Sequence, residues 1–149
     1  MIRKARIEDV GRIAEILVFN KRLNFFPIFQ DVQYAFKELN VMNIASELLD
    51  SYYHFYVYDD GVIKGVMEID GKELVTLYVD SFFQNEGIGS QLVEYAIDKH
   101  QIQYLWALEK NENAIRFYKR HRFIVSDEKK FEEDTIEYLV KLKRELCEL

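Results

Sequence analysis

The chain has 149 residues, of which 49% are hydrophobic and 31% are charged, and its formal net charge is −6. This composition is typical of one folded domain spanning residues 1–149, and it excludes a disordered chain. The negative charge argues against a basic nucleic-acid-binding face. No apolar run approaches the roughly 18–20 residues that cross a membrane, and the single cysteine, Cys147, excludes an internal disulfide. We therefore expect a cytoplasmic protein that binds neither nucleic acid nor membrane.

The first third of the chain predicts a short strand over residues 2–6 followed by helices. An amphipathic helix is indicated by apolar residues that recur with helical spacing, namely Val10, Ile13, Ala14 and Leu17. The stretch from Leu23 to Phe29 contains the only proline and is expected to break this helix. Further helices are predicted over about 31–40 and 44–50.

The pattern then changes to that of strands, over residues 52–58, 62–69 and 72–79. Asp70-Gly71 lies between the last two, and Asp-Gly is a strong hairpin signal. In a two-residue loop of this kind, Ile69 pairs with Lys72 and Glu68 pairs with Glu73. Two carboxylates would then face each other on adjacent strands.

The rest of the chain alternates helices and strands. A helix opens near Gly89, a strand covers 104–108, and Asn111 is placed to cap a second helix. Two last strands follow, over 123–125 and 138–142. The predicted fold is α/β (α+β): a mixed, mostly antiparallel central sheet of about seven strands with helices on both faces.

A glycine-containing loop lies between the strand that ends at Val79 and the next helix. Its residues are Gln84, Asn85, Glu86, Gly87, Ile88, Gly89 and Ser90. Paired glycines let a ligand approach the backbone closely, and the N–H groups of a helix N-terminus attract phosphate. A plain helix-entry turn is the alternative. The third glycine of the dinucleotide fingerprint is missing, and there is no Gly-Lys-Ser/Thr of a P-loop.

Three motifs together resemble the GNAT N-acetyltransferase superfamily. They are Leu77-Tyr78-Val79, Gln84-x-x-Gly87-x-Gly89 and Asn111-x-x-Ala114-x-x-Phe117-Tyr118-x-x-x-x-Phe123. The resemblance covers nearly the whole chain, because the order of strands and helices also fits. It implies a sheet that splays open between the fourth and fifth strands and holds acetyl-coenzyme A (acetyl-CoA) in the opening.

The resemblance also implies which residues bind this cofactor. The backbone of Leu77, Tyr78 and Val79 would hold the pantetheine arm, and residues 84–90 the pyrophosphate. Asn111, Ala114 and Phe117 would complete the site, with no metal. Two residues depart from the family pattern: Glu86 stands where a basic residue is common, and Arg122 where a glycine is common.

An acid and a base are the other chemical requirements of acetyl transfer to an amine. Tyr118 is at the family position close to the cofactor sulfur, so it is the candidate acid; packing beside Phe117 is the alternative. Glu73 matches the general-base glutamate of the family's histone acetyltransferases. Repulsion between Glu68 and Glu73 would raise the pKa of at least one of the two carboxyl groups. Glu68 is then expected to contact the substrate. The alternative is a solvated hairpin.

The acceptor side is expected in the loop after the first helix, where Phe25, Phe26 and Phe29 form an aromatic wall for the amine or simply pack. Trp106 replaces the glutamate of protein N-terminal acetyltransferases. No Ser/His/Asp or Cys/His group is evident near the loop, so we expect direct attack by a primary amine of a small molecule or peptide. A non-catalytic acyl-CoA sensor of the same fold is the alternative, and a homodimer is left open.

Overall fold

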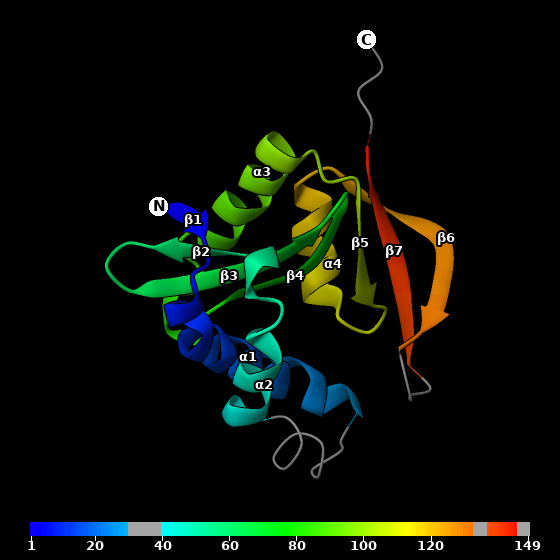
Figure 1. Cartoon of the computed structure of the whole chain (residues 1–149). Coiled ribbons are helices and arrows are strands. Elements are labelled where there is room, and N and C mark those ends of the chain that lie inside the picture. Colours follow the sequence, from blue (N-terminus) through cyan, green and yellow to red (C-terminus); the bar gives the residue numbers. More distant parts are fainter. Residues whose placement is uncertain (30–39, 133–136, 146–149) are drawn as a thin grey trace.

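The structure of the protein is a computed structural model. It describes residues 1–29, 40–132 and 137–145, and the side chains of the first range as far as Leu23. Seven strands form one sheet in the order β1-β2-β3-β4-β5-β7-β6 (Figure 1). Their bounds are β1 Ile2–Lys4, β2 Phe55–Asp59, β3 Ile63–Asp70, β4 Glu73–Val79, β5 Tyr104–Leu108, β6 Phe123–Phe131 and β7 Tyr138–Arg144. Only β4 and β5 are parallel, which confirms the predicted mixed sheet.

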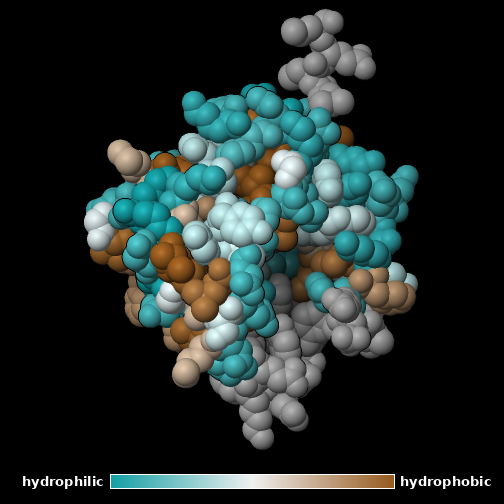
Figure 2. All heavy atoms as spheres, in the orientation of Figure 1, coloured by the Kyte–Doolittle hydropathy of each residue, from teal (hydrophilic) through white to brown (hydrophobic). Residues whose placement is uncertain are grey.

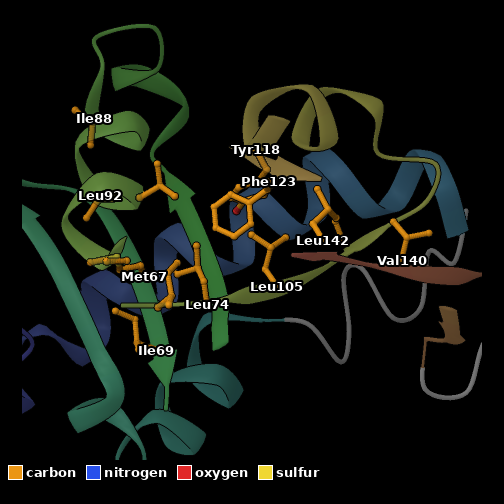
Figure 3. Close-up of a cluster of buried hydrophobic side chains, with 14 residues drawn as sticks. Met67, Ile69, Leu74, Ile88, Leu92, Leu105, Tyr118, Phe123, Val140 and Leu142 are labelled. Atoms are coloured by element: carbon orange, nitrogen blue, oxygen red, sulfur yellow. The ribbon is translucent and has the colours of Figure 1, made fainter. Parts of the chain in front are cut away.

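Helices cover both faces of the sheet, as predicted. Their bounds are α1 Val10–Phe29, α2 Val41–Leu48, α3 Ile88–His100 and α4 Glu112–Arg120. Met67 of β3 is buried in a hydrophobic cluster with α3 and α4, whereas its neighbour Val66 is buried in a cluster with α1 (Figure 3). Because side chains alternate along a strand, these two clusters lie on opposite faces.

The first helix does not end before Pro27, which corrects the predicted break over residues 23–29. The backbone of α1 stays helical through Phe29. In a helix interior, proline removes one hydrogen bond and its ring clashes with the carbonyl four residues earlier, at a cost of about 3 kcal/mol. The backbone of α1 nevertheless stays helical on both sides of Pro27. Phe25, Phe26 and Phe29 therefore belong to the last turns of α1 and not to a loop; their side chains lie outside the described residues. The predicted helix over 31–40 also lies outside them.

The β3–β4 hairpin has a different register from the predicted one. Asp70 pairs with Glu73, so the two-residue loop is Gly71-Lys72, with Gly71 at φ +61°. A positive φ at the first loop residue is the requirement of a type II′ turn, which glycine meets in that position. Glu68 pairs with Thr76, and the predicted pairing of Glu68 with Glu73 is wrong.

An extra residue interrupts the same ladder. Ile69 pairs with Leu74 and Glu68 with Thr76, which leaves Val75 of β4 without a partner residue on β3. Such a β-bulge bends the strand and turns its backbone groups away from the ladder. The bulge at Val75 lies just before Leu77-Tyr78-Val79, the motif that the resemblance assigns to the pantetheine arm.

The two halves of the sheet separate between β4 and β5. The parallel pairing of these strands consists of Glu73 with Tyr104 alone, at the start of both strands. The remainder of β4, from Leu74 to Val79, pairs with β3 on one edge and has no described strand paired with its other edge, which faces β5. The expected splay between the fourth and fifth strands is thus present (Figure 1).

Hydrophobic side chains remain exposed on the helices of the α1 side. Phe19, Leu23, Met42 and Leu49 are from 51% to 81% exposed. Figure 2 shows hydrophilic residues over most of the visible face, interrupted by hydrophobic patches.

Among the described residues, none of the helices combines the length and apolar character needed to span a membrane. The homodimer stays a prediction. The exposed side chains of Phe19, Leu23, Met42 and Leu49 are the first ones to substitute in testing it.

Arg122 provides a stability prediction, because it adopts φ +71° where the family commonly has glycine. An L-residue in this left-handed conformation costs about 1 kcal/mol relative to glycine. We expect Arg122→Gly to raise the thermal unfolding midpoint by about 2–4 °C for a domain of this size. Arg122→Ala is the control, since it removes the side chain but keeps the Cβ. An equal rise in both variants would show that backbone strain is not the cause.

Candidate active site

The loop before α3 has a backbone suited to an anion. Gly87 caps α3 at φ +79° and Asn85 is at φ +66°, so two residues of the loop turn left-handed within three positions. Alternation of this kind points successive N–H groups to one side, and the first N–H groups of α3 have no partners inside the helix. The loop therefore has the backbone conformation that an anion-binding turn requires, followed by free N–H groups at the start of α3.

Asp80 fixes the position of this loop relative to α1. Its carboxylate accepts from the guanidinium of Arg12 at 2.6 Å and from the N–H of Phe82 at 2.9 Å. Burial alone would raise the pKa of Asp80, but these two donors outweigh it and lower the pKa. Arg12 also donates to the carbonyl of Ile63 at 2.8 Å. The ionised carboxylate thus ties the loop to both α1 and β3.

Several of the predicted cofactor residues meet where β4, α3 and α4 converge. A Cβ added to Gly89 would lie 3.4 Å from the Phe117 ring and 3.6 Å from the side chain of Val79. Asn111 caps α4 by accepting from the N–H of Ala114 at 3.2 Å, as its sequence position predicted. Gln84 donates to the carbonyl of Val79 at 3.3 Å. The three sequence motifs are therefore neighbours in space.

Glu86, the departure from a basic residue, lies near a lysine. The pKa of Lys64 is raised mainly by its hydrogen bond to Asp60, with a smaller contribution from the charge of Glu86. The ammonium group of Lys64 is 2.8 Å from the Asp60 carboxylate and 4.7 Å from the centre of the Phe83 ring. The negative charge of Glu86 is thus partly balanced by this cation.

Tyr118 is buried in α4 beside the opening, at 9% exposure. Its ring packs edge-on against Phe117 and Phe123, with centroids 5.1 and 5.9 Å away. Figure 3 shows Tyr118 beside Phe123. Burial raises the pKa of its hydroxyl, so the phenol keeps its proton. None of the described residues hydrogen-bonds to this hydroxyl. Tyr118 is therefore a buried hydroxyl on α4 that stays protonated.

Glu68 lies on the other face of the sheet. Val66 two residues earlier packs toward α1, so Glu68 points to the α1 side. Burial raises the pKa of Glu68, although the charges of His54 and Lys21 and a 3.5 Å hydrogen bond from Thr76 oppose the shift. Carboxylate basicity, which was predicted from a Glu68–Glu73 pair, thus comes from burial.

Glu73 and Trp106 are also on the α1 side but in other surroundings. Glu73 is half-buried at the end of the hairpin, opposite Asp70 and next to Tyr104. Trp106 of β5 carries the ammonium group of Lys130 at 4.3 Å from its ring centre and that of Lys141 at 5.8 Å. Two lysine ammonium groups therefore lie near Trp106, the position at which protein N-terminal acetyltransferases have a glutamate.

Sequence analysis expected no Ser/His/Asp or Cys/His group near the loop and missed a polar cluster of Ser90, His121 and Glu94 there. Ser90 Oγ is 3.1 Å from Nε2 of His121, and Nδ1 of the same ring is 2.7 Å from the carboxylate of Glu94. Ser90 and Glu94 are four residues apart on α3 and share a helix face. His121 follows Tyr118 by three residues on α4. That spacing was the only sign of the cluster in the sequence.

Comparison with known proteins agrees with this geometry. The model of the acetyltransferase (GNAT) domain family matches residues 51–125, half of the chain. An uncharacterized N-acetyltransferase from the pepI 3′ region of Lactobacillus delbrueckii subsp. lactis is 27% identical over 119 residues, covering 62% of this chain and 69% of that protein.

Solved structures share the fold over nearly the full length. The PaiA N-acetyltransferase of Thermoplasma acidophilum, in complex with coenzyme A, is 21% identical with a TM-score of 0.73, covering 96% of this chain and 98% of that one. YncA of Salmonella typhimurium, with acetyl-CoA, is 17% identical with a TM-score of 0.65, covering 100% and 95%. The splayed sheet, the loop before α3 and the family match lead to one conclusion: the chain belongs to the GNAT acetyltransferase family.

Proposed function

We propose that the protein transfers an acetyl group from acetyl-CoA to a primary amine of a small molecule or peptide by direct attack. The observation that carries this proposal is the edge of β4 from Leu74 to Val79, which has no described strand beside it and is followed by the N–H groups at the start of α3. Such an edge offers backbone groups to an extended amide chain, and the N–H groups offer donors to a pyrophosphate. The buried hydroxyl of Tyr118 on α4 would be the proton donor.

The residues of this edge and of the loop before α3 fit acetyl-CoA. Leu77, Tyr78 and Val79 would hold the two amides of its pantetheine arm as an added strand would, and the loop from Gln84 to Ser90 would hold its pyrophosphate. A Cβ at Gly89 would already be in van der Waals contact with Phe117 and Val79, at 3.4 and 3.6 Å. Bound acetyl-CoA supplies a thioester carbonyl that an amine can attack.

Tyr118 lies on the face of the sheet that α3 and α4 cover, and Glu68 of β3 lies on the α1 face, so the two would serve the reaction from opposite faces. Tyr118 donates a hydrogen bond to the departing sulfur, whose thiol has an ordinary pKa near ~8.5. Glu68, with its raised pKa, accepts a proton from the ammonium form of the acceptor, which an ordinary carboxylate does poorly. We therefore assign the base to Glu68 and no longer to Glu73.

The alternative is a sensor of the same fold that binds acyl-CoA without turnover. The two functions differ in one product, because only the enzyme releases coenzyme A thiol in the presence of an acceptor. Thiol release should be screened with acetyl-CoA and a panel of amines that includes polyamines, amino sugars, amino acid derivatives and lysine peptides. Amine-dependent release supports the enzyme. Binding of acetyl-CoA without release by any amine supports the sensor.

A prediction for the loop is that Gly89→Asp lowers coenzyme A affinity about 100-fold or more, because a carboxylate beside a pyrophosphate costs several kcal/mol. Gly87→Trp should do the same by obstructing the N–H row. Calorimetric titration with coenzyme A measures both.

The matched control for the second variant is Gly71→Trp. Gly71 also has a positive φ, +61°, and open space around its Cβ position, but it lies in the β3–β4 turn. It should show the same conformational strain with unchanged affinity. Folded Gly89→Asp protein with wild-type affinity would place the phosphate site elsewhere.

A further inference from the structure

The cluster of Ser90, His121 and Glu94 joins the start of α3 to the end of α4. Ser90 belongs to the loop proposed for the pyrophosphate, but the proposed reaction uses neither the His121 imidazole nor the Glu94 carboxylate. The His121 side chain is 12% exposed, and the Glu94 side chain is 53% exposed. Among the described charged groups, only Glu94 contacts the imidazole. The Phe117 ring lies 4.9 Å from it, with the guanidinium of Arg120 5.9 Å from that ring. Arg122 follows in the chain.

Hydrogen-bond chemistry fixes one proton of this ring. A carboxylate can only accept, so Nδ1 of His121 must carry the proton in its 2.7 Å contact with Glu94. The second nitrogen, Nε2, then has two states. In the neutral ring it accepts the hydroxyl proton of Ser90 across 3.1 Å, and in the cationic ring it donates to Ser90 Oγ.

These two states present different groups to the loop. When the ring is neutral, the Ser90 proton is engaged with Nε2, and only oxygen lone pairs remain for a phosphate. When the ring takes a proton from solvent, Ser90 accepts from Nε2–H and its own O–H becomes free to donate. The cationic ring also adds a positive charge to a loop that carries Glu86 where a basic residue is common.

We propose that His121 is a positioning residue whose protonation, supported by Glu94, turns the hydroxyl of Ser90 toward the pyrophosphate of coenzyme A. Binding of the cofactor then takes up a proton at Nε2, and no covalent bond to Ser90 forms. Since the protonated form binds better, affinity falls as pH rises. This inference rests on the proposed function, because it requires the pyrophosphate to lie at the loop.

Calorimetric titration between about pH 5 and 8, the interval in which histidine changes charge, tests the inference. The ligand is dephospho-coenzyme A, because the terminal phosphate monoester of coenzyme A titrates near pH ~6 itself. Two buffers of different ionisation enthalpy report proton uptake at each pH. We expect wild-type affinity to fall roughly 10-fold as the pH rises, the value of one charge-assisted hydrogen bond.

Three variants separate a role in binding from a structural one. His121→Asn should bind weakly at every pH and take up no proton at this site. Glu94→Gln keeps an acceptor for Nδ1–H but removes the negative charge beside the cationic ring, so affinity at the low end of the pH range should fall below that of the wild type. His100→Asn is the matched control, since His100 lies at the far end of α3 against Tyr56, at 4.8 Å, and should match the wild type.

The outcomes are distinguishable from failure of the proposed function. Wild-type protein that binds neither coenzyme A nor its dephospho form overturns both. Normal binding with the same pH dependence in His121→Asn, even if its unfolding midpoint changes, overturns the inference alone. An acetyl group found on Ser90 by mass spectrometry after turnover would also overturn it, because the cluster would then activate a nucleophile.

Discussion

Tyr118→Phe is expected to lower the turnover number roughly 10²–10⁴-fold, the range for loss of a general acid, with little change in cofactor affinity. The substitution keeps the ring that packs against Phe117 and Phe123 and removes only the hydroxyl. Because burial raises the pKa of this hydroxyl, Tyr118 is a permanently protonated donor and not a group that titrates with activity. Steady-state thiol release with an active amine, together with calorimetric titration of coenzyme A, measures both quantities.

The control for this variant is Tyr95→Phe. Tyr95 is on α3, with its ring 5.9 Å from that of Tyr56 and 6.0 Å from that of His100, away from the opening. It should turn over as the wild type does. Wild-type turnover in Tyr118→Phe would mean that the phenol only packs and that solvent or another donor serves the leaving thiolate.

Glu68→Gln is expected to have the second large effect, a loss of roughly 10²–10⁴-fold near neutral pH. The raised pKa of Glu68 means that wild-type activity, which needs the ionised carboxylate, should rise with pH as Glu68 loses its proton, at a higher pH than for an ordinary glutamate. This rise of activity with pH is the acid limb of the pH–rate profile, and the glutamine variant should lack it. High pH should rescue the variant in part, because alkylamines become neutral near pH ~10.4 without help. The pH–rate profile of both proteins is the measurement.

The matched control for this residue is Glu73→Gln, on the same face of the neighbouring strand. Glu73 faces Asp70 across the hairpin, so its neutralisation should relieve repulsion between like charges and hold or slightly raise stability. Activity should stay near that of the wild type. If Glu73→Gln loses the acid limb and Glu68→Gln keeps it, the base is Glu73, as the resemblance to histone acetyltransferases implied.

Local patterns in the sequence were sufficient for much of the fold. The helix that follows Asn111 was predicted because its cap and apolar spacing are properties of neighbouring residues, and Asn111 does accept from the N–H of Ala114. The same holds for the glycine loop before α3. Motif spacing also brought Gly89 and Phe117, far apart in the chain, into one predicted site, where they are in contact.

Features that depend on competing or distant interactions were not predictable. The Asp70-Gly71 signal left two hairpin registers available, and the choice of Gly71-Lys72 places the positive φ at the first loop residue. Helix α1 continues past Pro27 although an interior proline costs about 3 kcal/mol, and a local helix-breaking signal does not show whether the rest of the fold outweighs it. The His121 contacts join two helices, and no local pattern encodes the distance between them.

Binding of acetyl-CoA in the opening between β4 and β5 is tested most directly by amide hydrogen exchange of the whole protein with and without acetyl-CoA. Exchange should slow within Leu77–Val79, at those N–H groups that face the open edge of β4 and not β3, and in Gly87–Ser90 at the start of α3, because these backbone N–H groups gain partners. Helix α2 should be unchanged, since it packs on the other face. Protection that spares both β4 and the loop while acetyl-CoA is demonstrably bound would place the cofactor elsewhere.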